Sequence, residues 1–280
     1  MAERSEMERG KRSAYTAGRT NSDNQMARKD KYYNRAKQQG YRSRSAFKLK
    51  QLDRDENLLG KGDVVVDLGA APGGWMEVAA EEVGEEGTVI GVDRQRIDDI
   101  EADATVKTIR GDMTEEDTRE QVRDVAGDVD TVISDMAPNM TGEYNLDAAR
   151  SAHLARMAFE TALDVLDSGG DLAVKIFQGQ DLEPLREDID EEFKYVRTMT
   201  PDASRDESSE VYLVAKERLT APVRAGEELT VTIEDVGSEG DGITSVDGFR
   251  LFVPDTEIGE TVDVRIDAVK SQFGFAERID

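Results

Sequence analysis

The sequence contains no cysteine and a single histidine, His153, among its 280 residues. Disulfides are therefore excluded, and so are the zinc sites that are built from thiolates or paired imidazoles. Lysine is also scarce beyond residue 50, where it occurs only six times. We expect no metal, so the chemistry has to come from carboxylates, amines, hydroxyls or a bound cofactor.

Long apolar runs are missing as well. No run approaches the about 18 residues that suggest a membrane span, and the first 30 residues are too polar for a secretory signal. We therefore expect a cytoplasmic protein with no membrane contact, and a monomer as the default state.

The charge is distributed unevenly along the chain. The formal net charge is −25, yet residues 1–50 hold 14 Lys and Arg against 5 Asp and Glu. The other 230 residues hold 22 against 56, a net −34. An acidic body of this kind is typical of proteins that work in concentrated salt, where a Debye length of ~3 Å at 1 M screens self-repulsion. We interpret the chain as halophilic, the alternative being an acidic mesophilic protein with a basic arm.

The N-terminal part divides into two segments. Residues 1–25 are polar and show no apolar period, which predicts a disordered arm. Residues 28–50 mix nine basic side chains with four aromatic ones, a composition that favours contact with phosphates and stacked bases. A merely solvated basic helix is the alternative.

Short apolar runs alternate with helical stretches between residues 26 and 218. This alternation predicts an α/β domain with a Rossmann-like, doubly wound sheet of seven strands. The expected strands are Asp63 to Leu68, Thr88 to Val92, Thr105 to Ile109, Asp130 to Ser134, Asp171 to Phe177, Tyr195 to Met199 and Val211 to Ala215. The expected helices are Gly74 to Glu82, Glu115 to Val125, Leu146 to Leu166 and Glu183 to Glu191, with a further early helix around Lys48.

The sequence pattern changes in residues 219–280. Short runs of alternating apolar and polar residues, each the length of a strand, are separated there by glycines, which predicts a small all-β barrel. The strands are expected at Leu229 to Ile233, Ile243 to Val246, Arg250 to Val253 and Thr261 to Ala268.

A glycine-rich turn follows the first predicted strand in VVVDLGAAPGGW, residues 64–75. Glycines let the backbone approach a ligand closely, and we expect main-chain N–H groups of Gly69, Gly73 and Gly74 to contact one. A dinucleotide site needs G-x-G-x-x-G, whereas this turn reads G-x-x-x-G-G. The spacing therefore favours a ligand without pyrophosphate, such as S-adenosylmethionine, over a nicotinamide dinucleotide.

Three predicted strands end in or near an aspartate, namely Asp67, Asp93 and Asp112. Asp93 is placed to accept hydrogen bonds from the ribose hydroxyls of a nucleoside cofactor, and Asp112 to lie near its adenine. A single such residue is as often a helix cap or a turn residue. Three on one sheet edge favour a binding site.

Two further strands deliver reactive groups. Asp135 leaves the fourth strand at its carboxyl end, and Lys175 lies inside the otherwise apolar run DLAVKIF. An amine in a core strand is costly unless it is neutral or paired, although a lysine can also reach solvent from a strand end. Lys48 and Glu210 would each be ordinary surface charges in isolation.

Five motifs, YRSRSAFKL, VDLGAAPGGW, SDMAPNMTG, VKIFQG and SSEVYLVA, together resemble the RrmJ/FtsJ family of RNA ribose 2′-O-methyltransferases. The resemblance covers about residues 28–216, in the family's order. It implies S-adenosylmethionine as cofactor. It also implies a catalytic tetrad of Lys48, Asp135, Lys175 and Glu210, and cofactor contacts from Gly73, Trp75, Asp93, Asp112 and Asp135.

The reaction implied is an in-line attack by a ribose oxygen on a sulfonium methyl group, without a metal. Lys175 is the candidate proton acceptor, but an ordinary lysine is charged near pH 7. Lys48 and burial favour the neutral amine, whereas Asp135 and Glu210 oppose it. Alternatively, Lys175 only orients the hydroxyl and stabilises developing negative charge.

The C-terminal region resembles a TRAM domain, which implies RNA binding. Four phenylalanines there, Phe249, Phe252, Phe273 and Phe275, are available either for base stacking or for the core. Residues 219–280 carry 5 Lys and Arg against 14 Asp and Glu, so long-range attraction to phosphate is not expected.

By resemblance, the expected substrate is a uridine in the A-loop of large-subunit (23S) ribosomal RNA, within the large ribosomal subunit. A transfer-RNA ribose is second. A non-catalytic RNA-binding assembly factor is disfavoured by the complete tetrad, and a nicotinamide-dependent oxidoreductase by the glycine spacing.

Overall fold

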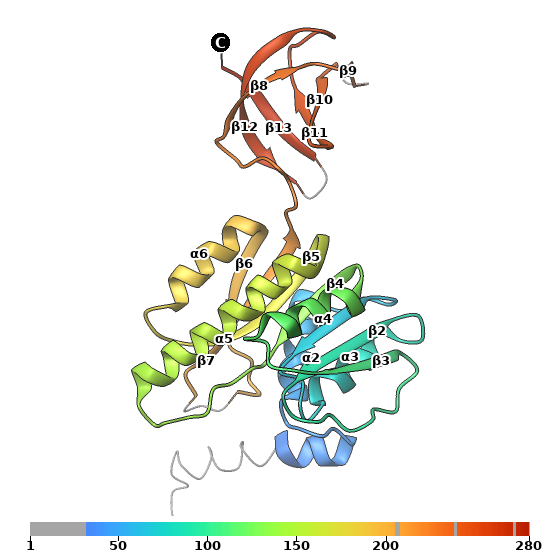
Figure 1. Ribbon diagram of the computed structural model, residues 1–280, viewed down its shortest axis with the longest axis vertical. Helices are drawn as coiled ribbons and strands as arrows, with labels where there is room; N and C mark the ends of the chain where they lie inside the picture. Colours follow the sequence, from blue (N-terminus) through green and yellow to red (C-terminus); the bar gives the residue numbers. More distant parts are fainter. Residues whose placement is uncertain (1–31, 205–207, 238–239, 271–272, 280) are drawn as a thin grey trace, which may run out of the picture.

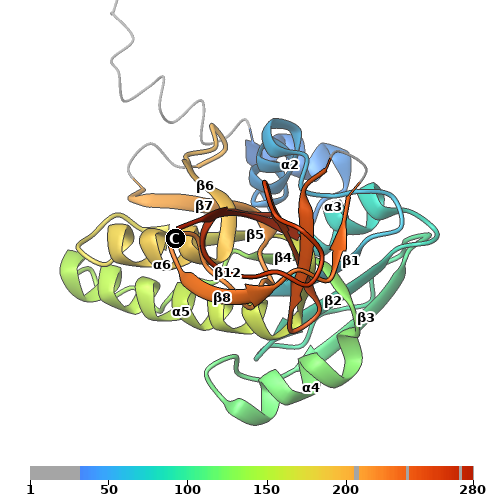
Figure 2. The same ribbon diagram turned by 90° about the horizontal axis from the view of Figure 1, so that it is seen from above.

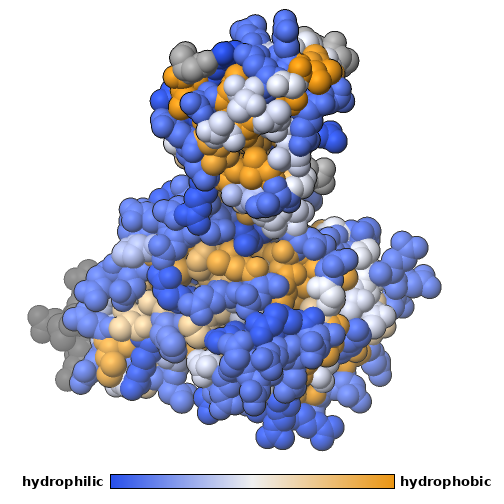
Figure 3. Space-filling model, turned by 45° about the horizontal axis from the view of Figure 1, so that its top comes forward, coloured by the Kyte–Doolittle hydropathy of each residue, from blue (hydrophilic) through white to orange (hydrophobic). Residues whose placement is uncertain are grey.

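The computed structural model describes residues 32–204, 208–237, 240–270 and 273–279. The arm predicted for residues 1–25 lies outside the described residues, as do residues 28–31 of the basic segment. No helix in the described ranges is long and apolar enough to cross a membrane. Figure 3 shows hydrophilic residues over most of the visible face, as the acidic composition predicts.

A seven-stranded sheet forms the larger unit (Figure 1). Its strand order is β3-β2-β1-β4-β5-β7-β6, so the chain reverses direction across the sheet beside the first strand. This is the doubly wound topology that the sequence predicted, in which ligands bind at the carboxyl ends of the strands. The strands are β1 (Val64–Leu68), β2 (Thr88–Asp93), β3 (Thr105–Arg110), β4 (Val129–Ser134), β5 (Leu166–Phe177), β6 (Phe193–Met199) and β7 (Glu210–Arg218).

Strand β7 runs antiparallel to both of its neighbours, a detail that the expected parallel sheet lacked. It returns from β6 and inserts between β6 and β5. Its first residue, Glu210, pairs with Phe177, the last residue of β5. The reversal therefore brings the start of β7 to the edge at which the parallel strands end.

Helices cover both faces of the sheet (Figure 2). On one face α2 (Ala46–Glu56) and α3 (Gly74–Val83) share a buried apolar cluster with β1 and β2. On the other, α4 (Glu116–Ala126), α5 (Tyr144–Val165) and α6 (Leu182–Glu192) pack on the second cluster. Residues 32–39 form a further helix that precedes α2.

The helix α5 shows how the sequence specifies this packing. Its buried residues Ala155, Ala158, Phe159 and Ala162 recur at helical spacing, so one stripe faces the sheet. The helix begins at Tyr144, two residues before the predicted start. Strand β5 also begins earlier than predicted, because Leu166 is buried and pairs with Val129 before an irregularity in the ladder.

The C-terminal unit is a curled six-stranded sheet around its own apolar core, as predicted for a small barrel. The prediction missed two strands. Strand β9 has only two residues, and in β13 a glycine and the flanking polar residues hide the alternation of apolar and polar side chains. The strands are β8 (Glu228–Thr232), β9 (Asp235–Val236), β10 (Gly242–Val246), β11 (Phe249–Val253), β12 (Thr261–Val269) and β13 (Phe273–Arg278).

The barrel is attached at the edge of the large sheet where the parallel strands begin. Strand β7 ends there at Arg218, and the N–H of Leu219 donates to the carbonyl of Glu192. Figure 1 shows the barrel beyond this edge, with the helix of residues 32–39 at the opposite one. The two ends of the larger unit are therefore structurally distinct.

Candidate active site

Side chains from four elements meet at the carboxyl edge of the sheet. Lys175 Nζ, from β5, donates to Asp135 Oδ1 at 2.8 Å and to the Asp135 carbonyl at 2.6 Å. Lys48 Nζ, from α2, lies 2.7 Å from Glu210 Oε1 and 3.7 Å from Asp135 Oδ1. The structure thus brings together the four residues that the sequence singled out as a tetrad.

This cluster is almost closed to solvent. Lys48 is 8% exposed, Lys175 5% and Glu210 9%. A buried charge is costly unless it is paired and hydrogen-bonded. Two amines against two carboxylates give formal neutrality, and their short contacts supply the pairing.

Tyr212 is a member of the site that the sequence reasoning missed. Its ring is fully buried, and its hydroxyl donates to Asp135 Oδ1 at 2.6 Å. A signal was present, because Tyr212 lies two residues after Glu210 on the same strand, and residues i and i+2 share a face of a sheet.

The local charges set the ionisation of Asp135. Burial alone would raise the pKa of this carboxyl, but the charges of Lys175 and Lys48 and the hydrogen bonds from Lys175 and Tyr212 outweigh it and lower the pKa. The pKa of Tyr212 is raised well above its ordinary value by burial and by the neighbouring Asp135 and Glu210. Asp135 is thus an anion and Tyr212 a neutral hydrogen-bond donor.

The glycine-rich turn lies beside this cluster. Gly69 has φ 81° and Gly73 has φ 108°, in the region that side chains rarely adopt. A Cβ on Gly69 would lie 2.3 Å from Met136 Cγ, so the turn and the loop after Asp135 pack in direct contact. The N–H of Gly69 donates to the carbonyl of Val92 on β2, and that of Gly73 to the carbonyl of Ala70, so these two groups already have partners within the protein. A contact from the N–H of Gly74 to a ligand stays a prediction.

Asp93 and Asp112 lie at the ends of neighbouring strands, as predicted. The two Asp93 oxygens accept the N–H groups of Ala71 (3.0 Å) and Gln95 (2.7 Å), and each oxygen keeps a second acceptor site. Asp112 Oδ1 accepts from the N–H and hydroxyl of Thr114, and these hydrogen bonds hold its pKa below the ordinary value.

The indole of Trp75 is part of the core. It is 3% exposed, its Nε1 donates to the Ser45 carbonyl at 2.8 Å, and its ring centroid lies 5.8 Å from that of Tyr212. A cofactor contact from Trp75 therefore stays a prediction that concerns its backbone, near the start of α3 at Gly74.

One buried carboxyl at this edge indicates which ligand charge the site would favour. Asp67 is 1% exposed, and its Oδ2 has no hydrogen-bond partner among the described residues. Burial, followed by the charges of Asp135 and Asp93, raises the pKa of Asp67 well above its ordinary value. A ligand that carries positive charge fits this edge, because it would favour the ionised form of Asp67 and offset the charge of Asp93.

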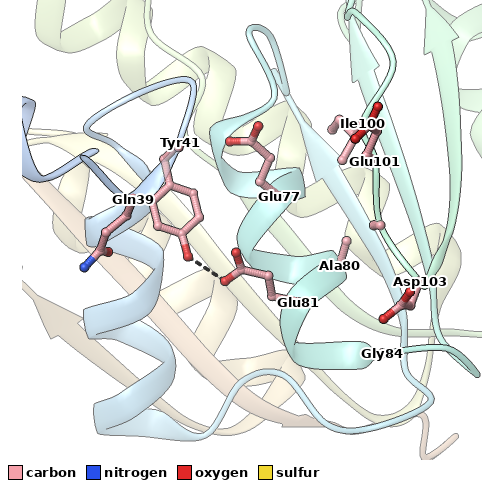
Figure 4. Close-up of a pocket in the computed structure, with 11 residues that line it drawn as sticks. Gln39, Tyr41, Glu77, Ala80, Glu81, Gly84, Ile100, Glu101 and Asp103 are labelled. Atoms are coloured by element: carbon pink, nitrogen blue, oxygen red, sulfur yellow. Dashed lines mark hydrogen bonds between the residues drawn. The ribbon is translucent and has the colours of Figure 1, made fainter. Parts of the chain in front are cut away.

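A separate pocket of about 800 Å³ lies on the outer side of α3 (Figure 4). Two of its acidic residues are engaged within the fold, since Tyr41 donates to Glu81 Oε2 at 2.5 Å and Arg42 pairs with Glu77 at 3.0 Å. Arg42 also donates to the carbonyl of Asp98 at 2.7 Å. Part of the predicted phosphate-binding segment therefore serves to dock residues 41–45 on the domain.

Comparisons with known proteins agree with this architecture. The model of the FtsJ-like methyltransferase family matches residues 41–218, and that of the TRAM domain matches residues 222–279. The described part of the chain holds no group of three or more His, Asp or Glu residues that could bind a metal ion.

Curated relatives match over most of the chain. "Ribosomal RNA large subunit methyltransferase E" of Natronomonas pharaonis is 64% identical over 91% of this chain and 100% of its own length. The protein of the same name from Haloarcula marismortui is 61% identical over 91% of this chain and 100% of its own. A crystal structure of a Plasmodium falciparum protein assigned as a ribosomal RNA methyltransferase is 26% identical, with a TM-score of 0.57, over 64% of this chain and 98% of its own. This chain therefore belongs to the FtsJ-like methyltransferase family and carries a TRAM domain at its C-terminal end.

Proposed function

We propose that this chain transfers a methyl group from S-adenosylmethionine to the ribose 2′-hydroxyl of a uridine in the A-loop of large-subunit ribosomal RNA. The convergence of Lys48, Asp135, Lys175 and Glu210 beside the glycine-rich turn carries the proposal. The names of the curated relatives support the large-subunit RNA as substrate. The proposal also includes the large ribosomal subunit as the form of the substrate, a cytoplasmic location, a monomeric state and activity in concentrated salt.

The cofactor would be held at the carboxyl edge of β1, β2 and β3. Asp93 and Asp112 would accept hydrogen bonds from its nucleoside, and Gly73 and the backbone of Trp75 would line the turn. When bound, the cofactor supplies an electrophilic methyl group on a cationic sulfur. Its positive charge fits the acidic edge, where Oδ2 of Asp67 has no hydrogen-bond partner among the described residues.

The hydrogen bonds of Lys175 define its part in the reaction. A neutral amine has two N–H donors and one lone pair. Both donors are accounted for by the carbonyl and the carboxylate of Asp135, at 2.6 and 2.8 Å. The lone pair is then left for a ribose hydroxyl, whose proton it accepts. In the ammonium form the same position carries a third N–H, which would orient the hydroxyl instead.

The other tetrad members act through position and charge. Asp135 holds the amine of Lys175 by two atoms, and Tyr212 fixes the carboxylate in turn. Lys48 places a cation near the site and is itself neutralised by Glu210. Such preorganised pairs align the reacting atoms without moving charge through solvent.

The C-terminal unit would bind RNA through exposed aromatic rings. Phe249 is buried, whereas Phe273 and Phe275 are 36% and 39% exposed. Together with Phe252 they form a cluster with ring centroids 5.5–5.8 Å apart. We place the methyltransferase domain at residues 26–218 and the RNA-binding barrel at residues 219–280.

The decisive test is methylation of large ribosomal subunits from cells that lack this gene. Incubation with labelled S-adenosylmethionine in molar KCl should add one 2′-O-methyl group, which mapping by alkaline resistance should place at an A-loop uridine. The Lys175→Ala variant is the control for contaminating activity. Methylation of transfer RNA, or of a base atom, would contradict the proposal.

A further inference from the structure

The loop that follows Asp135 exposes apolar side chains. Every residue from 139 to 146 is exposed, and these residues include Met140, Tyr144 and Leu146 at 64%, 59% and 40%. We call these three side chains the apolar rim. Three large apolar side chains this exposed within seven residues cost free energy in water, so they point to a contact surface.

The rim lies beside the sheet edge that carries the tetrad. The hydroxyl of Tyr144 donates to the carbonyl of Gln178 at 2.7 Å, and Gln178 directly follows the end of β5. The N–H of Gln178 in turn donates to the carbonyl of Ser209 at 2.8 Å, one residue before Glu210. Two hydrogen bonds thus connect the ring of Tyr144 to the strand that supplies a tetrad carboxylate.

The rim is also held in place before any ligand binds. Asp147 accepts the N–H and the hydroxyl of Thr141 at 2.8 Å each, and the N–H of Gly142 at 3.0 Å. The hydroxyl of Ser151 accepts the N–H of Phe177 at 3.0 Å, which fastens α5 to the end of β5. A fixed aromatic ring loses little conformational entropy when it stacks.

The position of the rim indicates its occupant. A ribose that reaches Lys175 brings its own base and the two adjacent bases to the protein surface around the tetrad. Base stacking needs a flat, exposed aromatic face and no positive charge, so it remains effective on an acidic, salt-adapted surface. Tyr144 offers such a face, and Met140 and Leu146 add exposed apolar surface close by in the chain.

We propose that the apolar rim, with Tyr144 at its centre, stacks on the base of the methylated nucleotide or of its immediate neighbour in single-stranded RNA. The inference rests on the proposed function and adds the group that positions the substrate. Tyr144 acts as a positioning and specificity residue and touches no reacting atom.

Steady-state kinetics with large ribosomal subunits test the stacking. Tyr144→Ala should raise KM for the subunits by about 10- to 100-fold while KM for S-adenosylmethionine and kcat stay within about threefold. Tyr144→Phe keeps the ring and should stay close to the wild type. The matched control is Tyr195→Ala, which removes a 39% exposed tyrosine near the other end of the sheet, whose hydroxyl is held by Glu56 at 2.7 Å.

Two kinetic outcomes would overturn the inference. One is an unchanged KM in Tyr144→Ala. The other is an equal defect in Tyr144→Phe and Tyr144→Ala, because the hydroxyl contact to Gln178 would then matter and the ring would not.

Crosslinking identifies the contact independently of rate. With p-azidophenylalanine in place of Tyr144, irradiation of the complex with large subunits should stop reverse transcription within about two nucleotides of the methylated position. Crosslinks to a ribosomal protein or to distant RNA, while the wild type still methylates, would refute the rim contact alone. Failure of the wild type to methylate would remove the proposed function and the inference with it.

Discussion

Lys175 and Asp135 are joined twice, once through the carboxylate and once through the backbone carbonyl of the aspartate. The carbonyl contact fixes the amine to the main chain at the end of β4, so its position does not depend on a side-chain rotamer alone. Lys48 approaches the same carboxylate oxygen only to 3.7 Å. The two lysines are therefore not equivalent, and Lys175 is the one whose geometry is set by Asp135.

Replacing Lys175 by alanine should lower kcat by about 10²- to 10⁴-fold, the usual contribution of a positioned acid or base. Affinity for S-adenosylmethionine, measured by calorimetry, should stay within a few-fold, because the cofactor contacts expected from Asp93 and Asp112 do not involve this amine. Lys216→Ala is the matched control, since Lys216 is paired with Asp171 and with the Asn57 carbonyl near the opposite edge. Near-normal turnover by Lys175→Ala would remove Lys175 from the mechanism.

Replacing Tyr212 by phenylalanine tests whether the hydroxyl supports Asp135. The change removes a 2.6 Å hydrogen bond to a partly buried carboxylate and should cost about 1.5–3 kcal/mol of unfolding free energy. It should also raise the pKa of Asp135, because one of the contacts that lower it is lost. Denaturant unfolding measures the first effect.

Tyr195→Phe is the comparison for that variant, since Tyr195 is 39% exposed and its hydroxyl donates to Glu56. The loss of unfolding free energy should be about 0.5–1.5 kcal/mol, the usual net contribution of a single hydrogen bond. Equal losses of unfolding free energy in Tyr212→Phe and Tyr195→Phe would mean that the hydrogen bond to Asp135 stabilises the fold no more than the one to Glu56.

Much of this site was predictable because its residues lie at strand ends. The runs that end at Asp93 and Asp135 are apolar and short, and the carboxyl ends of parallel strands share one edge. Lys175 was conspicuous for a different reason, since an amine within a buried strand demands a partner.

Other features depended on facts that no local pattern carries. The antiparallel direction of β7 follows from long-range packing, and it is what brings Glu210 to the carboxyl edge of the parallel strands. The commitment of the Gly69 and Gly73 N–H groups depends on the tertiary path of the turn. The exposure of Tyr144 depends on where α5 begins, and helix ends are the least certain part of a sequence-based prediction.

The protonation of Asp67 should make stability depend on pH. Its folded pKa lies well above the ordinary 3.8, so the folded state binds the proton more tightly than the unfolded state. Stability from this group is present at low pH and declines as the pH rises above about 3.8 through the folded pKa. Asp67→Asn removes the dependence, so the melting temperature of the variant relative to the wild type should increase between pH 4 and pH 8.

In the same variant, any gain in affinity for S-adenosylmethionine with rising pH should be lost, because an amide cannot ionise to supply negative charge to a cationic ligand. Asp241→Asn, on the barrel, is the control. A difference in melting temperature that stays flat across this pH range would show that Asp67 has no raised pKa.

Salt dependence separates this chain from ordinary RNA-binding proteins. Binding to a polyanion normally weakens as salt rises, because counterions are released when basic groups contact phosphates. Here the 230 residues after the basic segment carry a net −34. In dilute buffer, at about 0.01 M, the Debye length is ~30 Å, so nearly the whole acidic body repels the RNA. At 1 M it is ~3 Å, and only groups in direct contact act. Methyl transfer should therefore rise several-fold from dilute buffer toward molar KCl.

Circular dichroism at each salt concentration separates this effect from unfolding. Maximal activity at low ionic strength in a folded sample would show that the basic segment outweighs the acidic body.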